Sequence, residues 1–288
     1  MLEIAPCVYI ESAYSGVTLG AIAWENNLIL IDAPLKPDDT RLWRSSLSSI
    51  SHSVERLLIN LDAHIDRTLG ARAMECTIMG HEAVAEVFRS RPLTFKAQSV
   101  DSGAEWEQCE GISNTRWASP DIVFNQELFF HQENSIIHLE KCPGVGIGSI
   151  CVQMPVEKVI FIGDMVTPNQ PPFLADADLP AWMSCLNRLL TTPFKDYKIV
   201  SGRGGLIQPG DVKDQLKYLQ KVEKVINNLV KKDHLPENLD SYVNNLLTDF
   251  SMPAGRKNHF IKRLEYGIKQ YFFHHFISSS PDNLPESI

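Results

Sequence analysis

Apolar residues occur first in short β-prone runs and later, toward the C-terminus, at the three-to-four-residue spacing of helices. The apolar runs 17–24 and 28–31 flank Glu25-Asn26-Asn27, which predicts a hairpin around an Asn-rich turn. Further strands are predicted over 56–60, 77–79, 122–130, 135–139, 148–154, 158–162 and 198–200. Helices are predicted over 40–51, 68–75, 82–88, 179–190, 212–229 and 260–275. This order indicates two β-sheets packed together with helices outside, a layered α/β fold.

The two C-terminal helical stretches each carry apolar residues on one face. Such spacing favours packing onto the rest of the protein, so we expect a body over residues 1–210 and a helical extension over 211–278. The spacing leaves a second interpretation open, in which these helices form a homodimer. Residues 279–288 include Pro281 and Pro285 and are expected to be a disordered tail.

The charge balance and the cysteine pattern narrow the class of protein. The 288 residues include 27 basic and 35 acidic side chains, a net charge of −8, whereas a nucleic-acid-binding protein usually has a basic face. No apolar run approaches the roughly 18 residues that a membrane span needs, and the N-terminus does not resemble a signal peptide. We therefore expect a cytoplasmic protein without a membrane partner, whose six scattered cysteines are reduced thiols.

The most informative motif follows the predicted strand that ends at Asn60. Asp62, His64 and Asp66 alternate with other residues and offer one imidazole and two carboxylates at close spacing. Loops at strand ends are where α/β proteins place ligands. This set of side chains could bind a divalent metal ion, although so short a motif also occurs by chance.

At this point the chain resembles the metallo-β-lactamase superfamily, whose signature is HxHxDH at the end of such a strand. Four further blocks resemble that family in order and spacing: a strand ending in Asp at 27–32, a strand-to-helix junction at 79–82, a strand ending in Gly-Asp at 159–164 and a Gly-rich turn at 200–205. Lys141-Cys142-Pro143-Gly144 stands where the family usually has His-Thr-Pro-Gly. The resemblance covers about residues 8–230 and is strongest to the glyoxalase-II-like hydrolase branch. It implies a four-layer αββα sandwich with the site along one edge of the two sheets.

The resemblance also maps the family's seven metal-binding positions onto this chain. They correspond to Asp62, His64, Asp66, Arg67, Lys141, Asp164 and Arg203. Arg67, Lys141 and Arg203 stand where the family has His. Arginine has no free lone pair and stays protonated, and lysine could ligate only after losing its proton.

Three carboxylates and three cations at these positions predict an ion-pair network in the space of the metals. Our first hypothesis is therefore an atypical or pseudo-hydrolase without the dinuclear site and without a cofactor. It would bind a small anionic ligand through Arg67, Lys141 and Arg203, helped by the backbone N–H groups of the Gly-rich turn. The alternative is a hydrolase of an ester, thioester or phosphodiester. It would hold one Zn, Mn or Fe ion through Asp62, His64 and Asp164, and Asp66 would orient the attacking water.

Two other segments allow a functional and a structural interpretation. Cys142, next to Lys141, could be the nucleophile of a Cys–His pair, or it could be a packed small residue in the family's Thr position. The segment Pro171-Pro172-Phe173 could cover a pocket as a lid, or it could simply connect two elements.

Overall fold

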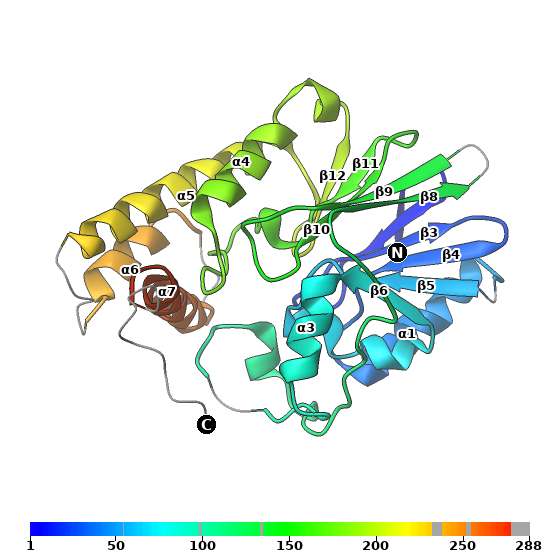
Figure 1. Cartoon of the computed structure of the whole chain (residues 1–288), viewed down its shortest axis with the longest axis horizontal. Helices are drawn as coiled ribbons and strands as arrows, with labels where there is room; N and C mark the ends of the chain where they lie inside the picture. The colour runs from blue at the N-terminus through cyan, green and yellow to red at the C-terminus, as the bar shows by residue number, and fades with distance from the viewer. Residues whose placement is uncertain (54, 98–99, 133–134, 232–237, 252–254, 278–288) are drawn as a thin grey trace.

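The computed structural model of the chain describes residues 1–277 except 54, 98–99, 133–134, 232–237 and 252–254, and it contains two β-sheets (Figure 1). The first sheet has seven strands in the order β1 (Leu2–Ala5), β2 (Val8–Glu11), β3 (Leu19–Ala23), β4 (Asn27–Ile31), β5 (Glu55–Ile59), β6 (Thr77–His81) and β7 (Ile122–Phe124). The second has six in the order β13 (Gly205–Ile207), β12 (Lys198–Ser201), β11 (Val159–Phe161), β10 (Ile150–Met154), β9 (Ser135–Lys141) and β8 (Glu127–Gln132).

Strand directions bring several strand ends to one edge of the sandwich. Strands β1 to β4 pair antiparallel, whereas β4, β5, β6 and β7 run parallel. In the second sheet β11 and β12 are parallel, and the other neighbours are antiparallel. The loops after the parallel strands therefore gather polar side chains at one edge, as ligand sites in α/β folds require.

Apolar side chains from both sheets fill the space between them. Ile31 and Met79 of the first sheet share this inner core with Val152 and Phe161 of the second. On the outer face of the first sheet, Trp43 of α1 (Pro37–Ser46) packs in a separate core, and α3 (Glu82–Ser90) follows β6 directly. These layers form the first half of an αββα sandwich.

The outer face of the second sheet is covered by α4 (Leu179–Leu189) and α5 (Pro209–Val230) (Figure 1). The helices α6 (Asp240–Leu247) and α7 (Lys257–Phe272) pack into the same apolar core, and a π-helical turn, Phe273–Ile277, follows α7. The α/β class, the four layers and the C-terminal helices are therefore confirmed. Among the described residues, no helix is long and apolar enough to cross a membrane.

Two predicted elements were wrong in detail. The run 122–130 is not one strand, because the chain leaves the first sheet after β7 and enters the second as β8. The helix predicted over 68–75 is replaced by a short helix α2 (Ile65–Thr68) and a 3₁₀ turn, Ala71–Met74. Strands β1, β2 and β13, each three or four residues long, were not predicted. The expected disordered tail lies outside the described residues.

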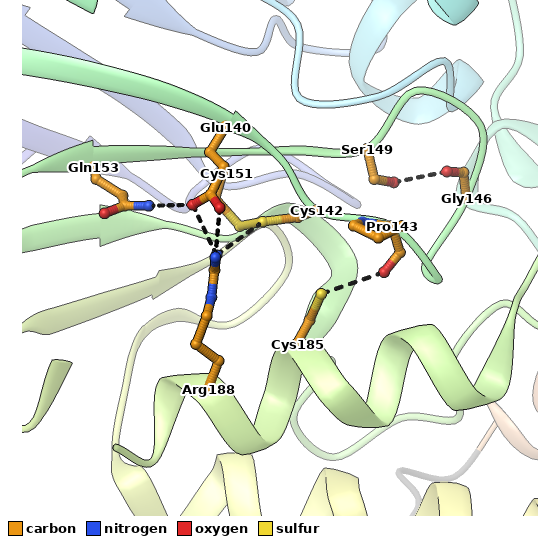
Figure 2. The surroundings of a disulfide bond; sticks show 9 residues. All are labelled: Glu140, Cys142, Pro143, Gly146, Ser149, Cys151, Gln153, Cys185 and Arg188. Carbon is orange, nitrogen blue, oxygen red and sulfur yellow. Dashed lines mark hydrogen bonds and ion pairs between the residues drawn. A yellow bond between two sulfur atoms is a disulfide. The ribbon is translucent and has the colours of Figure 1, made fainter. Parts of the chain in front are cut away.

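The expectation that all cysteines are free thiols is wrong for one pair. Cys142 and Cys151 form a disulfide bond, with their Cα atoms 5.9 Å apart (Figure 2). They meet because β9 and β10 pair antiparallel, so the residue after β9 lies beside the second residue of β10. Cys142 therefore has no free thiol in this structure, which contradicts its interpretation as a nucleophile. The bond closes the loop 143–149, which borders the site described next.

Candidate functional site

Acidic side chains follow the strands that end at the shared edge. Asp32 comes after β4, Asp62 and His64 follow β5, and Asp164 follows β11. Asp32 adopts a φ of 58°, a left-handed conformation that Asp tolerates better than most residues, and its Oδ1 accepts the N–H of Leu61 at 3.0 Å. The ends of β4 and β5 are thus joined at the start of the site.

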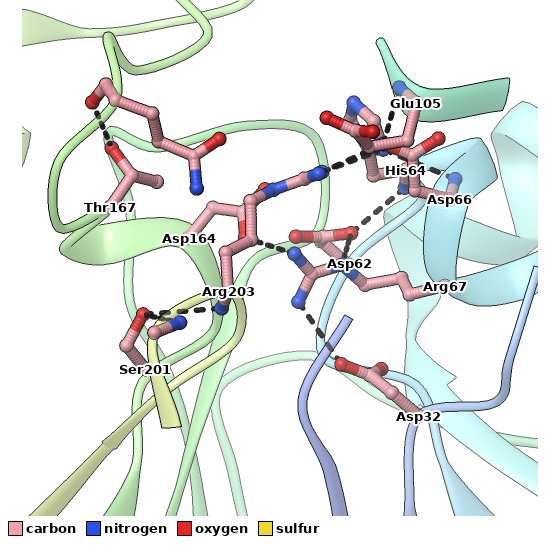
Figure 3. A network of polar contacts seen from close by, with 12 residues as sticks. Asp32, Asp62, His64, Asp66, Arg67, Glu105, Asp164, Thr167, Ser201 and Arg203 are labelled. Atoms are coloured by element: carbon pink, nitrogen blue, oxygen red, sulfur yellow. Dashed lines mark hydrogen bonds and ion pairs between the residues drawn. The ribbon is translucent and has the colours of Figure 1, made fainter. Parts of the chain in front are cut away.

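Arg67 lies at the centre of the site and is completely buried (Figure 3). Its Nη1 donates to Asp32 at 3.0 Å, its Nε lies 3.2 Å from Asp62, and its Nη2 contacts Asp164. The guanidinium group lies so close to the backbone of Gly202 that a Cβ there would approach Nη1 within 2.7 Å. A glycine is therefore required at 202 to admit the arginine.

Arg203 forms the second cationic centre, and its side chain is only 1% exposed. Its Nε donates to the second oxygen of Asp164 at 2.8 Å, and its Nη1 donates to Asp66 at 2.9 Å (Figure 3). Both oxygens of Asp164 are thus engaged by guanidinium groups. Asp66 also accepts the backbone N–H groups of Glu105 and Trp106, at 3.2 and 2.9 Å.

Asp32, Asp66 and Asp164 respond differently to this environment. Burial alone would raise the pKa of Asp66 and Asp164, but the neighbouring positive groups, Arg203 foremost for Asp164, hold both pKa values below the ordinary range. Burial raises the pKa of Asp32 to about 7, and Arg67 offsets this only in part. The cluster therefore holds two carboxylates with lowered pKa values and one carboxyl group whose pKa lies near 7.

His64 has a defined protonation state. Its Nδ1 accepts the N–H of Asp66 at 3.2 Å and lies 3.3 Å from Nη2 of Arg203. Burial lowers the pKa of His64, so the ring is neutral at pH 7. Because Nδ1 is the acceptor, the ring proton must be on Nε2, for which the described residues provide no partner.

Phe173 covers this side of the cluster. Its ring lies 4.6 Å from the imidazole of His64 and 4.6 Å from the guanidinium carbon of Arg203, and Arg263 of α7 lies over it at 4.1 Å. Such contacts favour a cation next to an aromatic face. Phe173, the last residue of the segment 171–173, therefore belongs to the wall of the site.

A second group of charges connects the C-terminal helix to the site. Glu105 pairs with Arg256, and His259 and Arg263 of α7 lie 3.5 and 3.6 Å from its carboxylate. Hydrogen bonds from His259 and Arg256 overcome the effect of burial and hold the pKa of Glu105 far below its ordinary value. The backbone N–H of Glu105 also reaches Asp66, so this group continues directly into the main cluster.

A pocket of about 300 Å³ adjoins the cluster, at the small end of the range for ligand sites. Asp62, His64 and Asp164 form part of its lining. The other walls include Val87, Arg91, Trp106, Phe173, Asp176, Arg263, Tyr266 and the loop residues Val145, Gly146 and Ile147. Three of these wall residues belong to the loop that the disulfide closes.

The structure brings together six of the seven residues that the sequence singled out. Asp62, His64, Asp66, Arg67, Asp164 and Arg203 form one contact network. Lys141 is the exception: it ends β9, is exposed, and has no ion pair within the part of the chain that the structure describes. Its expected place in the network was wrong, because β9 continues through it and pairs Lys141 with Ile150.

Several residues of the site were missed by the sequence analysis. Asp32 lies in the matched block 27–32, but no interaction was predicted for it. Its place directly after β4 could have identified it as a residue of the site. Glu105, Arg91 and Arg263 lie in stretches without a motif, and only the folded chain brings them to the site.

The donor set does not fit a metal ion. Both oxygens of Asp164 bind guanidinium groups, and Asp66 is engaged on both oxygens. His64 uses Nδ1 within the network, which leaves its Nε2 and one oxygen of Asp62. Two ligands beside two guanidinium groups are too few and too close to positive charge for a zinc, manganese or iron site. In agreement, no group of three or more His, Cys, Asp or Glu with metal-site geometry occurs among the described residues.

Comparison with known proteins gives one family. The model of the family described as "Metallo-beta-lactamase superfamily" matches residues 63–226. A search of curated protein sequences finds no match. Among solved structures, a metallo-beta-lactamase from Pontibacter korlensis is 18% identical with a TM-score of 0.58, and the match covers 76% of this chain and 97% of that one.

Two other solved structures have the same fold. The sec-alkylsulfatase Pisa1 from Pseudomonas sp. is 13% identical with a TM-score of 0.66; the match covers all of this chain and 52% of that one. Metallo-beta-lactamase IND-7 is 13% identical with a TM-score of 0.54, over 74% of this chain and 91% of that one. At such low identities these similarities describe the fold alone.

Proposed function

The chain belongs to the metallo-β-lactamase superfamily, and we propose that it is a metal-independent member that binds a small molecule next to a cluster of buried ion pairs. The sequence resemblance implies that intact members attack esters, thioesters or related groups with a metal-bound hydroxide. In this chain Arg67 and Arg203 lie among the carboxylates at the corresponding positions. A binding or regulatory role follows more directly from this arrangement than metal-dependent hydrolysis does.

One observation carries this proposal: Asp164 is held by both arginines, one on each oxygen. A metal ion at this carboxylate would have to displace two buried guanidinium groups, whose charges would then lie unpaired beside the ion. The cluster is thus complete without a metal. Asp62 and His64 line the pocket, and the network leaves one oxygen of Asp62 and Nε2 of His64 unused; these atoms suit hydrogen bonds to a polar group of a bound molecule.

Elemental analysis tests the proposal. Protein expressed with zinc, manganese and iron supplied should retain far less than one equivalent of any metal after dialysis. Prolonged treatment with EDTA should leave its melting temperature unchanged.

A near-stoichiometric metal that is lost in Asp164→Asn would overturn the proposal. That result would support the alternative of a mononuclear hydrolase using Asp62, His64 and Asp164. Asp38→Asn is the matched control for the substitution, because Asp38 is exposed and its ion pair is with Arg41, which is not part of the cluster.

A further inference from the structure

Arg91 differs from the other arginines around the pocket. Arg67, Arg203, Arg256 and Arg263 each lie within 4.0 Å of a carboxylate. Arg91 has no ion pair among the described residues, although it lines the same pocket. Its charge is offset only from beyond ion-pair distance, by Asp62 and Asp176 of the same pocket, which leaves the guanidinium group available to a ligand anion.

The guanidinium group of Arg91 is held in a fixed orientation. Its Nη2 donates to the carbonyl oxygen of Ala63 at 2.8 Å, and its carbon atom lies 4.8 Å from the ring of Phe88 and 4.5 Å from that of Trp117. Two aromatic contacts and one backbone hydrogen bond restrict the side chain before any ligand arrives. Such preorganisation reduces the entropy lost on binding.

The remaining amino group of Arg91 lacks a partner. Nη1 is shielded from solvent and has no hydrogen bond within the described part of the chain. Burial lowers the pKa of Arg91 to about 10, and the carboxylates of Asp62 and Asp176 offset this effect only in part. A buried donor of this kind is rare in proteins unless a water, an ion or a ligand satisfies it.

The pocket around Arg91 is mainly apolar. Its walls include Val87 of α3 and the loop residues Val145 and Ile147, with Ile65 and Leu174 nearby. Because the volume is about 300 Å³, only a small ligand fits.

Resting on the function proposed above, we propose that the pocket binds a small monocarboxylate with an apolar chain, and that Arg91 binds its carboxylate. Arg91 is half-buried in the pocket wall, and one of its two terminal nitrogens already donates to Ala63, so it suits one singly charged carboxylate better than a doubly charged phosphate. Asp62 and Asp176 also line the pocket and would repel a second negative charge. This assignment moves the anion site away from Arg67 and Arg203, whose donors are occupied by the cluster.

Calorimetric titration of the EDTA-dialysed protein tests the inference. The probes are straight-chain monocarboxylates from butanoate to octanoate, with 1-alkanols and primary alkylamines of matched length. Each carboxylate that binds should bind at least tenfold more tightly than its matched alcohol, and the amine should bind most weakly.

Arg91→Gln should reduce carboxylate affinity at least tenfold, about 1.4 kcal/mol, and leave alcohol affinity unchanged. Arg89→Gln is the matched control, because Arg89 is exposed in the last turn of α3, the helix that Arg91 directly follows, and it should bind like the unaltered protein. A purely structural role of Arg91 would weaken both classes of probe equally. If Arg91→Gln fails to fold, the preference of the unaltered protein for carboxylate over alcohol still tests whether the pocket binds a carboxylate.

The outcomes separate this inference from the proposed function. If alcohols and carboxylates bind the metal-free protein equally, or if Arg91→Gln retains the preference, the carboxylate site is wrong while metal-independent binding stands. If no probe binds until zinc or manganese is restored, the proposed function fails together with the inference. If no probe binds under either condition, the carboxylate site is overturned and the metal analysis decides the function separately.

Discussion

At the scale of single residues, the charges of the cluster do not balance when every group is ionised. Asp32, Asp62, Asp66 and Asp164 supply four carboxylates, and Arg67 and Arg203 supply two cations. Negative charge is therefore in excess. Asp32 is the carboxyl group whose pKa is raised, to about 7, so it can take up a proton near neutral pH. A proton on Asp32 would bring the cluster closer to neutrality. Stability should therefore depend both on the arginines and on this proton.

Arg67→Met tests the arginines. The substitution keeps much of the side-chain volume but leaves three buried carboxyl groups without their shared cation. Breaking a buried ion pair from one side costs about 3–5 kcal/mol, so chemical denaturation should show a loss of that order. Arg41→Met is the control, because Arg41 forms an exposed pair with Asp38 and should change stability little. Equal midpoints for both variants would mean that the cluster contributes no more than a surface pair.

Asp32→Asn tests the proton. In the unfolded chain Asp32 titrates near 3.8, whereas in the folded protein it retains its proton up to about pH 7. Stability from this group is therefore fully present below pH 4 and decreases as pH rises toward 7, by about 1.4 kcal/mol per unit. Between pH 5 and pH 7 the unaltered protein should lose about 2–3 kcal/mol relative to the variant, whatever the variant's absolute stability. Parallel stability curves of the two proteins would show that Asp32 is ionised throughout.

Most residues of the cluster could be predicted from the sequence, because they follow strands in one local motif or in matched blocks. The position of Lys141 could not be predicted, because it depends on how far β9 extends. Arg91 and Arg263 could not be predicted for a different reason. They come to the pocket only through the packing of α3 and α7, which no local sequence pattern indicates.

At the scale of elements, the connection between β9 and β10 shapes one wall of the pocket. The disulfide between Cys142 and Cys151 closes it, Cys142 donates its N–H to Ser149, and the carbonyl oxygen of Ile147 accepts the N–H of Ala63. The loop is thus fixed both to itself and to the segment that carries Asp62 and His64. The sequence predicted a strand on each side of this connection but not the bond, since the two cysteines lie nine positions apart without a CxxC pattern.

Replacing Cys142 and Cys151 together by Ser should loosen this wall. Loss of so short a cross-link should reduce stability by about 2–3 kcal/mol. Hydrogen exchange of the Ala63 amide and of the amides in 143–149 should accelerate, whereas exchange in α1, on the opposite layer, should follow the global change only. Cys7→Ser is the control, because Cys7 is an exposed free thiol. Uniform acceleration across the protein would show that the bond stabilises the whole fold and not the loop in particular.

The sequence analysis also failed to predict where the chain crosses from the first sheet to the second. The run 122–130 is apolar enough for one strand, yet its halves belong to different sheets. Local hydrophobicity cannot distinguish a continuous strand from two short strands joined by a crossing, because it does not show which other strands each half pairs with. The pairing of β8 with β9 over six residue pairs decides the outcome, and that pairing is not local.

At the scale of the whole molecule, the C-terminal helices are part of the main structure. Apolar residues of α5, α6 and α7 share one core with α4 and with strands β10 to β12. The apolar faces identified from the sequence are therefore buried within the chain, and a homodimer would have to use other surfaces. Through Arg263 and Tyr266, α7 also completes the pocket.

A chain ending at residue 208 should therefore fail to fold cooperatively. It would expose Ile160 and Ile199, which α5 helps to bury, and it would leave Glu105 buried without Arg256. Both effects act against folding, because apolar surface would return to water and a carboxylate would lose its cation. We expect a weak near-ultraviolet circular dichroism signal, binding of a hydrophobic dye and no sharp thermal transition, against a sharp one for the full chain. A native-like spectrum with a cooperative transition would show instead that residues 1–208 form an independent domain, to which the helices are an addition.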